Sequence, residues 1–242
     1  MVCHAAGSFV REPSLPWGDR GVPTMKAIVR SEQVRVGPLA LPGDLDLPAG
    51  ARSLVLFAHG SGSSRLSSRN RWVAEVLQQH RLGTLLFDLL SDDEAAERRR
   101  VFDIALLAER VEQALEWAAN QPALAGMQVG LFGASTGAAA ALCAAAARPG
   151  RVGAVVSRGG RPDLALPCLA RVSAPTLLIV GGADREVLEL NRQALRELRC
   201  NKRLEVVPGA THLFEEPGAL DSVAELAAAW FETHLGRGRH PL

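Results

Sequence analysis

A serine between two glycines is the first feature of the sequence that could carry chemistry. The segment Gly133-Ala134-Ser135-Thr136-Gly137 fits the pattern G-x-S-x-G, with the apolar run Val129 to Phe132 before it and an alanine-rich stretch after it. In such a strand–turn–helix setting the chain turns sharply and holds the serine hydroxyl above the edge of a sheet. Glycines at both flanks leave room for that turn. The sequence therefore predicts that Ser135 is a nucleophile rather than one residue of an ordinary tight turn.

A serine hydroxyl needs a general base, and the order of residues after Ser135 favours His212. His212 follows the apolar run Leu204 to Val207, so it is expected on a loop at the carboxyl edge of a parallel sheet, where catalytic loops gather. His234 lies within a later amphipathic stretch, and His240 lies in the C-terminal tail. We therefore expect His212 to be the base, with a loop histidine of no catalytic role as the alternative.

An acidic residue is expected to orient the imidazole of His212 and to stabilise its charged form. Asp184 follows the apolar run Thr176 to Val180 through two glycines and an alanine. Asp163 is its competitor, because it follows the earlier apolar run Val152 to Val156. The two glycines favour a tight turn, so we predict that Asp184 is the acid. The alternative is that Asp184 only caps the helix predicted to follow it.

Two backbone N–H groups are expected to bind the oxyanion of a tetrahedral intermediate. One belongs to Thr136, directly after the nucleophile. The second is expected in the glycine- and serine-rich loop 59–64, where we favour the N–H of Ser61 and keep Gly62 as an alternative. This loop lacks the Gly-Lys-Ser/Thr ending of a nucleotide site, and we interpret His59 as a structural residue that braces it.

Two arginines follow the apolar run Val152 to Val156, at the same predicted edge of the sheet. Arg158 and Arg161 lie in the glycine-containing segment 157–163. A guanidinium group in this place can hold a carboxylate or phosphate of a substrate. Both residues are therefore candidates for substrate binding, and the alternative is two arginines on an ordinary surface loop.

The elements that must position these residues alternate between apolar runs and amphipathic stretches. This alternation predicts an α/β fold in which a mostly parallel sheet carries helices on both faces. Residues 34–36 and 39–47, broken by Pro42-Gly43, are interpreted as edge strands. The predicted buried strands are 53–58, 82–86, 129–132, 152–156, 176–180 and 204–207, and the predicted helices are 69–80, 101–120, 138–148, 186–198 and 220–235.

Composition places the chain among soluble globular proteins. It has 242 residues, of which 48% are apolar and 22% charged, and a formal net charge of +1. A charge so close to zero gives no reason to expect nucleic acid or a membrane as partner. The scattered cysteines, which form no C-x-x-C pair, favour a reducing, cytoplasmic compartment; they are Cys3, Cys143, Cys168 and Cys200. No two histidines have metal-ligand spacing, so neither a metal nor a cofactor is expected.

The N-terminal segment differs from the rest of the chain. Residues 1–24 mix charges, glycines and prolines and contain no apolar core of a secretory signal. We interpret them as a flexible leader outside the fold. Residues 25–242 are then predicted to form a single domain.

Four segments, taken in order, resemble the α/β-hydrolase superfamily, and most closely its dienelactone hydrolase-related family. They are residues 59–65, 133–137, 181–184 and 209–212. The resemblance implies an α/β-hydrolase fold and ester hydrolysis by Ser135, Asp184 and His212. Dienelactone hydrolases proper are similar but have a cysteine at the position of Ser135, so the resemblance implies ester hydrolysis and not dienelactone specificity.

The substrate is expected to be a small-molecule ester. The segments between Val156 and Thr176 and from Asp88 to Arg98 are short where many relatives carry a lid, so we expect little or no lid and a shallow, open pocket. Such a pocket favours small or short-acyl esters or lactones over long-chain lipids. Two alternatives are a catalytically silent binding or regulatory module and an acyltransferase or perhydrolase with the same residues.

Overall fold

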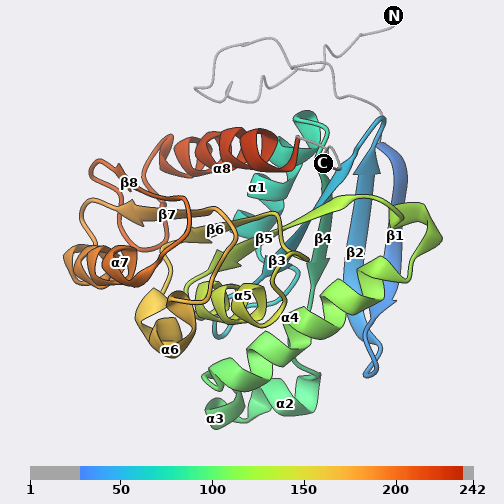
Figure 1. Ribbon diagram of the computed structural model, residues 1–242, viewed down its shortest axis with the longest axis horizontal. Helices are drawn as coiled ribbons and strands as arrows, with labels where there is room; N and C mark the ends of the chain where they lie inside the picture. The colour runs from blue at the N-terminus through green and yellow to red at the C-terminus, as the bar shows by residue number, and fades with distance from the viewer. Residues whose placement is uncertain (1–27, 237–242) are drawn as a thin grey trace, which may run out of the picture.

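An eight-stranded sheet runs through the molecule in the computed structural model, which describes residues 28–236 (Figure 1). The strands are β1 (Ile28–Val36), β2 (Leu41–Pro48), β3 (Ser53–Ala58), β4 (Gly83–Phe87), β5 (Gln128–Ala134), β6 (Ala154–Arg158), β7 (Thr176–Gly181) and β8 (Lys202–Val207). Their order in the sheet is β1-β2-β4-β3-β5-β6-β7-β8. β1 pairs antiparallel with β2, and β2 pairs antiparallel with β4. The six strands β3 to β8 are parallel to one another. The mostly parallel sheet predicted from the sequence is confirmed.

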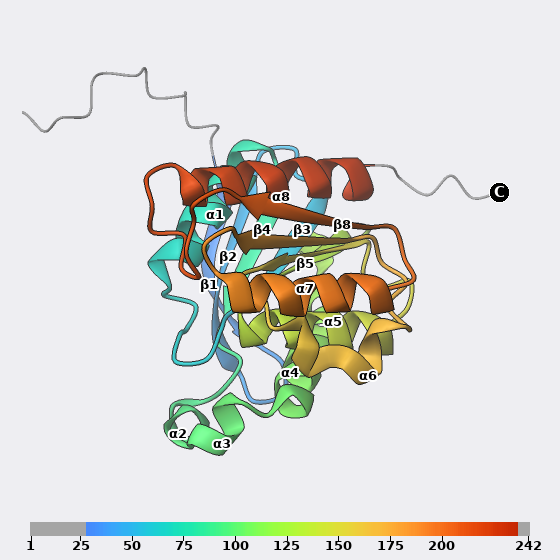
Figure 2. The same ribbon diagram turned by 90° about the vertical axis from the view of Figure 1, so that its left-hand side faces the viewer.

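Helices cover both faces of this sheet, and Figure 2 shows the sheet between the two layers. One layer consists of α1 (Ser68–Gln79) and α8 (Ala219–Leu235), and the other of α4 (Ile104–Ala119), α5 (Thr136–Ala147) and α7 (Arg185–Glu197). Shorter pieces are α2 (Asp92–Ala96), α3 (Arg98–Val101), α6 (Leu166–Leu169), η1 (Pro122–Leu124) and η2 (Pro162–Ala165).

Strand alternation divides the core between the two layers, since successive side chains of a strand point to opposite faces. In β3, Leu56 packs on the side of α4 and α5, while Phe57 packs on the side of α1 and α8. Phe132 of β5 joins Phe57 on that side, with ring centroids 4.9 Å apart. The continuous apolar runs of the sequence thus serve two cores at once, as is typical of a sheet that is buried on both faces.

Two strands differ from the sequence prediction. β2 runs unbroken through Pro42-Gly43 and lies inside the sheet, between β1 and β4. Pro42 has no N–H to give, but its carbonyl accepts from the N–H of Asp88 at 3.0 Å, which keeps the chain in place. β8, predicted as a buried strand, is the far edge of the sheet, so only its last residue, Val207, is buried.

The helix predicted over 101–120 is shorter than expected. Val101 ends the separate helix α3, and α4 begins at Ile104. The carboxylate of Asp103 accepts from the N–H of Leu106 at 3.0 Å and thereby caps the start of α4. The charged segment 92–101, which follows β4, thus forms two short helices, α2 and α3.

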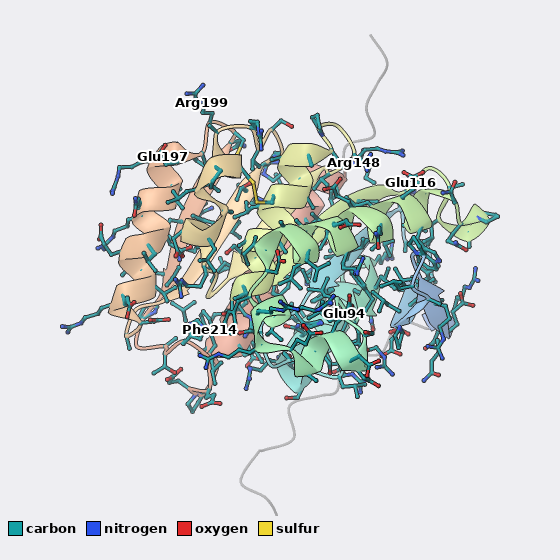
Figure 3. The ribbon with its side chains drawn as sticks, turned by 90° about the horizontal axis from the view of Figure 1, so that it is seen from below. Glu94, Glu116, Arg148, Glu197, Arg199 and Phe214 are labelled. Atoms are coloured by element: carbon teal, nitrogen blue, oxygen red, sulfur yellow. A yellow bond between two sulfur atoms is a disulfide. The ribbon has the colours of Figure 1, made fainter. Side chains whose placement is uncertain are left out.

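Two of the cysteines are joined in a disulfide bond. Cys143 of α5 and Cys168 of α6 form a disulfide (Figure 3), while Cys200 is free. The residues are 25 positions apart with no motif between them, so the pairing was missed from the sequence. The finding removes the argument by which the scattered cysteines favoured a reducing compartment.

Two further expectations concern the ends of the chain and membranes. The predicted leader, residues 1–24, and Cys3 within it lie outside the described residues. Within residues 28–236, no helix is both long and apolar enough to cross a bilayer.

Candidate active site

Ser135 lies at a sharp turn between β5 and α5. Its backbone angles are φ 51° and ψ −120°, a conformation that residues with a side chain rarely adopt. The N–H of Ser135 donates to the carbonyl of Arg158 at 3.3 Å, and the carbonyl of Ser135 accepts from the N–H of Arg161 at 3.1 Å. Its side chain does not cap α5, which leaves the hydroxyl free for another task. The geometry is that of the strained turn expected for a nucleophile.

The two glycines of the motif are required by close packing. A methyl group on Gly133 would collide with the backbone of Ala138, in the first turn of α5. A methyl group on Gly137 would collide with the carbonyl oxygens of Ala58 and His59, at the end of β3. The pattern G-x-S-x-G therefore lets α5 approach both its own strand and the neighbouring one.

The predicted acid and base are in direct contact. His212 Nδ1 lies 2.7 Å from Asp184 Oδ2, a distance typical of a charge-assisted hydrogen bond. Asp184 occupies the N-cap position of α7, but its side chain makes no capping bond to that helix. The carboxylate therefore orients the imidazole and leaves Nε2 to face other groups.

Backbone hydrogen bonds between two loops bring this pair together. The N–H of Gly182 donates to Val207 at 2.8 Å, and the N–H of Ala183 donates to Ala210 at 2.9 Å. Any side chain on Gly181 would collide with the carbonyl oxygens of Ala210 and Thr211. The glycines that pointed to Asp184 in the sequence thus allow the loop of His212 to lie against the end of β7.

Ser135 and His212 converge on Gly159. The N–H of Ser135 bonds to the residue before Gly159, and a Cβ placed on Gly159 would lie 3.7 Å from Cε1 of His212. No hydrogen bond joins the hydroxyl of Ser135 to His212 in this structure. Bonds of this kind are often long before substrate binds and tighten in the reacting complex.

The two predicted oxyanion donors are neighbours. Thr136 is the first residue of α5, where helical N–H groups have no partner within the helix. The N–H of Ser61 donates to the hydroxyl of Thr136 at 2.8 Å. The sequence did not indicate this bond, and the Thr136 hydroxyl must turn aside before Ser61 can donate to a substrate. Gly62, the alternative, has φ +69° and open space beside it.

His59 braces the loop that carries Ser61. Its Nε2 accepts from the N–H of Leu89 at 3.0 Å, so the proton resides on Nδ1, which faces the carbonyl of Gly60 at 3.0 Å. Burial lowers the pKa of His59, against the smaller opposing effects of the Gly60 carbonyl and the Asp88 charge. The structural role inferred from the sequence is confirmed by these two contacts.

The two candidate arginines are in different environments. Arg161 forms two hydrogen bonds with Asp163, at 2.9 and 2.8 Å, and this pairing raises its pKa. The same pairing occupies Asp163, the competitor of Asp184, in a contact that does not involve His212. Arg158 is buried and forms no ion pair with any residue of 28–236.

A cavity of about 560 Å³ opens beside the Ser61 loop. Its apolar part is formed by Leu89, Leu90, Val101 and Leu107, so the short helix α3 provides one of its walls. Its volume lies in the range of sites for small molecules.

Sequence reasoning missed one polar residue at this end of the sheet. Asn70 is buried at 2% exposure and accepts a hydrogen bond from Arg158 at 3.3 Å. The signal was a polar residue in line with Val73, Ala74 and Leu77, the buried face of α1. A buried asparagine on an apolar stripe indicates a specific partner, although not which one.

Comparison with known proteins identifies relatives of this chain. A model of the dienelactone hydrolase family matches residues 86–234. Two proteins of Mycobacterium tuberculosis, from strains CDC 1551 / Oshkosh and ATCC 25618 / H37Rv, are each 57% identical over 209 residues. Both are provisionally named phosphoribosyl transferases. The match covers 86% of this chain but 47% of each relative, so the chain spans about half the length of the curated relatives it matches.

Solved structures agree with the family model. A dienelactone hydrolase from Anabaena variabilis is 56% identical, with a TM-score of 0.81 over 85% of this chain and 97% of its own. Est1E from Butyrivibrio proteoclasticus has a TM-score of 0.73 over 86% of this chain and 99% of its own, and at 15% identity it shares the fold. The family model covers more than half of the sequence, and the chain therefore belongs to the dienelactone hydrolase family.

Proposed function

We propose that this chain is a serine hydrolase that cleaves small or short-acyl carboxylic esters or lactones through an acyl-enzyme on Ser135. The observation that carries the proposal is the Asp184–His212 hydrogen bond beside a serine held at φ 51°. A half-buried carboxylate that fixes an imidazole next to a strained serine is the arrangement by which a weak hydroxyl nucleophile is activated.

In the proposed reaction the Ser135 oxygen attacks the ester carbonyl while His212 Nε2 takes the hydroxyl proton. Asp184 stabilises the imidazolium that forms. The N–H groups of Thr136 and Ser61 bind the oxyanion of the tetrahedral intermediate. When the intermediate collapses, His212 returns the proton to the departing alcohol. Water then attacks the acyl-enzyme by the same steps and releases the acid and Ser135.

The size and lining of the cavity beside Ser61 support a short acyl group. Its apolar wall of leucines and Val101 favours hydrocarbon, and its volume of about 560 Å³ is shared with polar loop residues. The covering helices α2 and α3 have five and four residues, too short to enclose a long chain. Part of a decanoyl chain would therefore extend into water. The free energy gained from burial, per carbon atom, would be smaller for decanoyl than for butyryl.

The name of the mycobacterial relatives suggests a transferase, but it describes proteins of which this chain covers 47%. Acyl transfer or perhydrolysis differs from hydrolysis only in the nucleophile that attacks the acyl-enzyme. Both alternatives keep the roles proposed for Ser135 and His212. A catalytically silent binding module would give these residues no such roles. Turnover by the wild type that is lost in a Ser135 variant would exclude that alternative.

The test is hydrolysis of p-nitrophenyl acetate, butyrate and decanoate by the wild type and Ser135→Ala. We expect kcat/KM to fall at least about tenfold from butyrate to decanoate. Ser135→Ala should lose a thousandfold or more in kcat, on the order of other serine nucleophiles.

The matched control is Ser222→Ala, because the exposed Ser222 hydroxyl donates to the carbonyl of Gly218, the N-cap residue of α8. It should keep wild-type rates. A flat profile across the three esters would refute the short-acyl preference, and full activity of Ser135→Ala would refute the nucleophile.

A further inference from the structure

Arg158 is a buried cation without a counterion among residues 28–236. Its exposure is 7%, its Nη2 donates to Asn70 Oδ1 at 3.3 Å, and its Nε has no hydrogen-bond partner. The structure contains a useful comparison in Arg110, which is 8% exposed and pairs with Glu94 (labelled in Figure 3) at 3.0 Å. Among the described residues, Arg158 has no carboxylate in the place that Glu94 takes for Arg110.

The surroundings of Arg158 oppose its charge. Burial, and next the charge of Arg69, lower its pKa to about 10, so the guanidinium stays charged at neutral pH. The ion-pair partner of Arg69 is Glu215, at 3.5 Å, and the Glu215 side chain is 65% exposed. A buried charge without a partner is strongly unfavourable, and an anion supplied from outside the chain would remove that cost.

Arg158 is also next to the nucleophile. It ends β6 opposite Ala134 of β5, and its carbonyl accepts the N–H of Ser135. Its side chain shares the face of Ala154 and Val156, the face covered by α1 and α8. Asn70 reaches it from the first turn of α1, the helix that follows the loop of Ser61. Arg158 thus connects the strand next to the nucleophile strand with the helix that follows the loop of Ser61.

We propose that Arg158, with Asn70 and Arg69, forms a subsite for a carboxylate or phosphate group on the ester that Ser135 cleaves. Two oxygens of a carboxylate or phosphate group can accept two parallel hydrogen bonds from a guanidinium, which Nε and Nη1 of Arg158 can supply. Arg69 adds a second positive charge. Arg161 is not part of the subsite, because Asp163 already holds its guanidinium. The inference rests on the proposed function and narrows its substrates to anionic esters.

Paired esters test this specificity. Monoethyl glutarate is compared with ethyl pentanoate, and 1-acetylglycerol 3-phosphate with 1-acetylglycerol, which separates a carboxylate from a phosphate. We expect the wild type to prefer the charged member of one pair at least tenfold in kcat/KM. Arg158→Met should reduce that ratio at least tenfold, and the matched Arg161→Met should preserve it. Equal rates within both pairs, or a ratio that survives Arg158→Met, would overturn the proposal.

A binding measurement makes the test independent of turnover. Thermal unfolding is followed in sodium phosphate, sodium glutarate and sodium chloride at equal ionic strength. One of the two anions should raise the Tm of the wild type by 2 °C or more and leave Arg158→Met unchanged, since only a ligand of the folded state stabilises it. In chloride, Arg158→Met should melt at or above the wild type, because methionine removes an unpaired buried charge.

The two measurements separate the possible failures. An anion response without hydrolysis of any ester would contradict the proposed function and support the subsite. Hydrolysis of esters without an anion response or a charge preference would refute the subsite and keep the function. An Arg158→Met protein that melts below the wild type, with no anion response in either protein, would show that Arg158 only supports the fold.

Discussion

At the scale of single residues, Asp184 shows that the site is built at some cost to the fold. It is the N-cap residue of α7, yet its carboxylate accepts no bond from that helix. A capping side chain contributes about 1 kcal/mol to helix stability, and here that contribution is given up. The carboxylate is instead committed to His212 at 2.7 Å. The position is therefore better explained by the imidazole than by α7.

This assignment predicts a large effect of Asp184→Asn. The amide can no longer stabilise the imidazolium and presents His212 with the wrong hydrogen-bonding partner, so kcat for a short ester should fall about a thousandfold to ten-thousandfold. Asp163→Asn is the matched control, because Asp163 pairs with Arg161, and its kcat should stay within about threefold of the wild type. Steady-state kinetics on p-nitrophenyl butyrate measure kcat for both variants. A large loss in Asp163→Asn with a small one in Asp184→Asn would identify Asp163 as the acid.

His59 gives the fold a dependence on pH. Burial holds its pKa below the ordinary value of about 6.5, so the unfolded chain binds a proton that the folded chain does not. Its contribution to the free energy of unfolding is complete above about pH 7 and is lost as pH falls below about 6.5, by up to about 1.4 kcal/mol per pH unit.

Urea unfolding of the wild type and His59→Gln between pH 8 and pH 5 measures this loss. The glutamine variant should lose less stability on acidification, because it has no imidazole to protonate. An identical pH dependence in the wild type and His59→Gln would exclude His59 as its source.

At the scale of elements, the site depends on how closely α5 approaches the sheet. The helix is almost all alanine and is buried on most sides, so its narrow profile lets it fit between β5 and α4. Its first turn lies against the end of β3 through Gly137. The disulfide from Cys143 to Cys168 fastens the same helix to α6. The turn at Ser135 is therefore held from several sides, as a strained conformation requires.

Gly137→Ala is expected to break this contact. The added methyl group meets backbone carbonyl oxygens that cannot move aside, so the variant should lose about 3 kcal/mol or more of stability and its esterase activity with it. Gly126→Ala is the control: its φ of +78° disfavours alanine, but nothing lies within 4 Å of the new atom. It should lose only about 1 kcal/mol. Urea midpoints measure both losses, and a loss at Gly137 no larger than that at Gly126 would contradict the collision.

At the scale of the whole molecule, the sheet collects loops from distant parts of the chain at one edge. β3, β5, β6, β7 and β8 are parallel neighbours. Arg158 is the last residue of β6, and Ser61, Ser135, Asp184 and His212 follow the ends of β3, β5, β7 and β8. Because all five strands run the same way, their carboxyl ends share one edge. The order of motifs along the sequence was therefore enough to predict that these residues lie at one edge of the sheet and that Asp184 contacts His212.

Contacts between side chains of different layers were beyond sequence reasoning. Arg158 and Asn70 are separated by 88 positions and Ser61 and Thr136 by 75, and no periodicity relates the members of either pair. The place of a strand in the sheet was also ambiguous. Leu41–Pro48 contains a proline typical of an edge and lies inside, while Lys202–Val207 ends in an apolar run and lies at the edge. Local pattern shows that a strand exists, but the neighbours decide its burial.

Reaction with a fluorophosphonate tests whether Ser135 is an activated nucleophile and requires no knowledge of the substrate. Intact-mass analysis is made on the wild type, Ser135→Ala and Ser222→Ala after exposure to the reagent. We expect one adduct on the wild type and on Ser222→Ala, and none on Ser135→Ala. A folded wild type that stays unmodified, or a Ser135→Ala protein that carries the same adduct, would contradict this expectation.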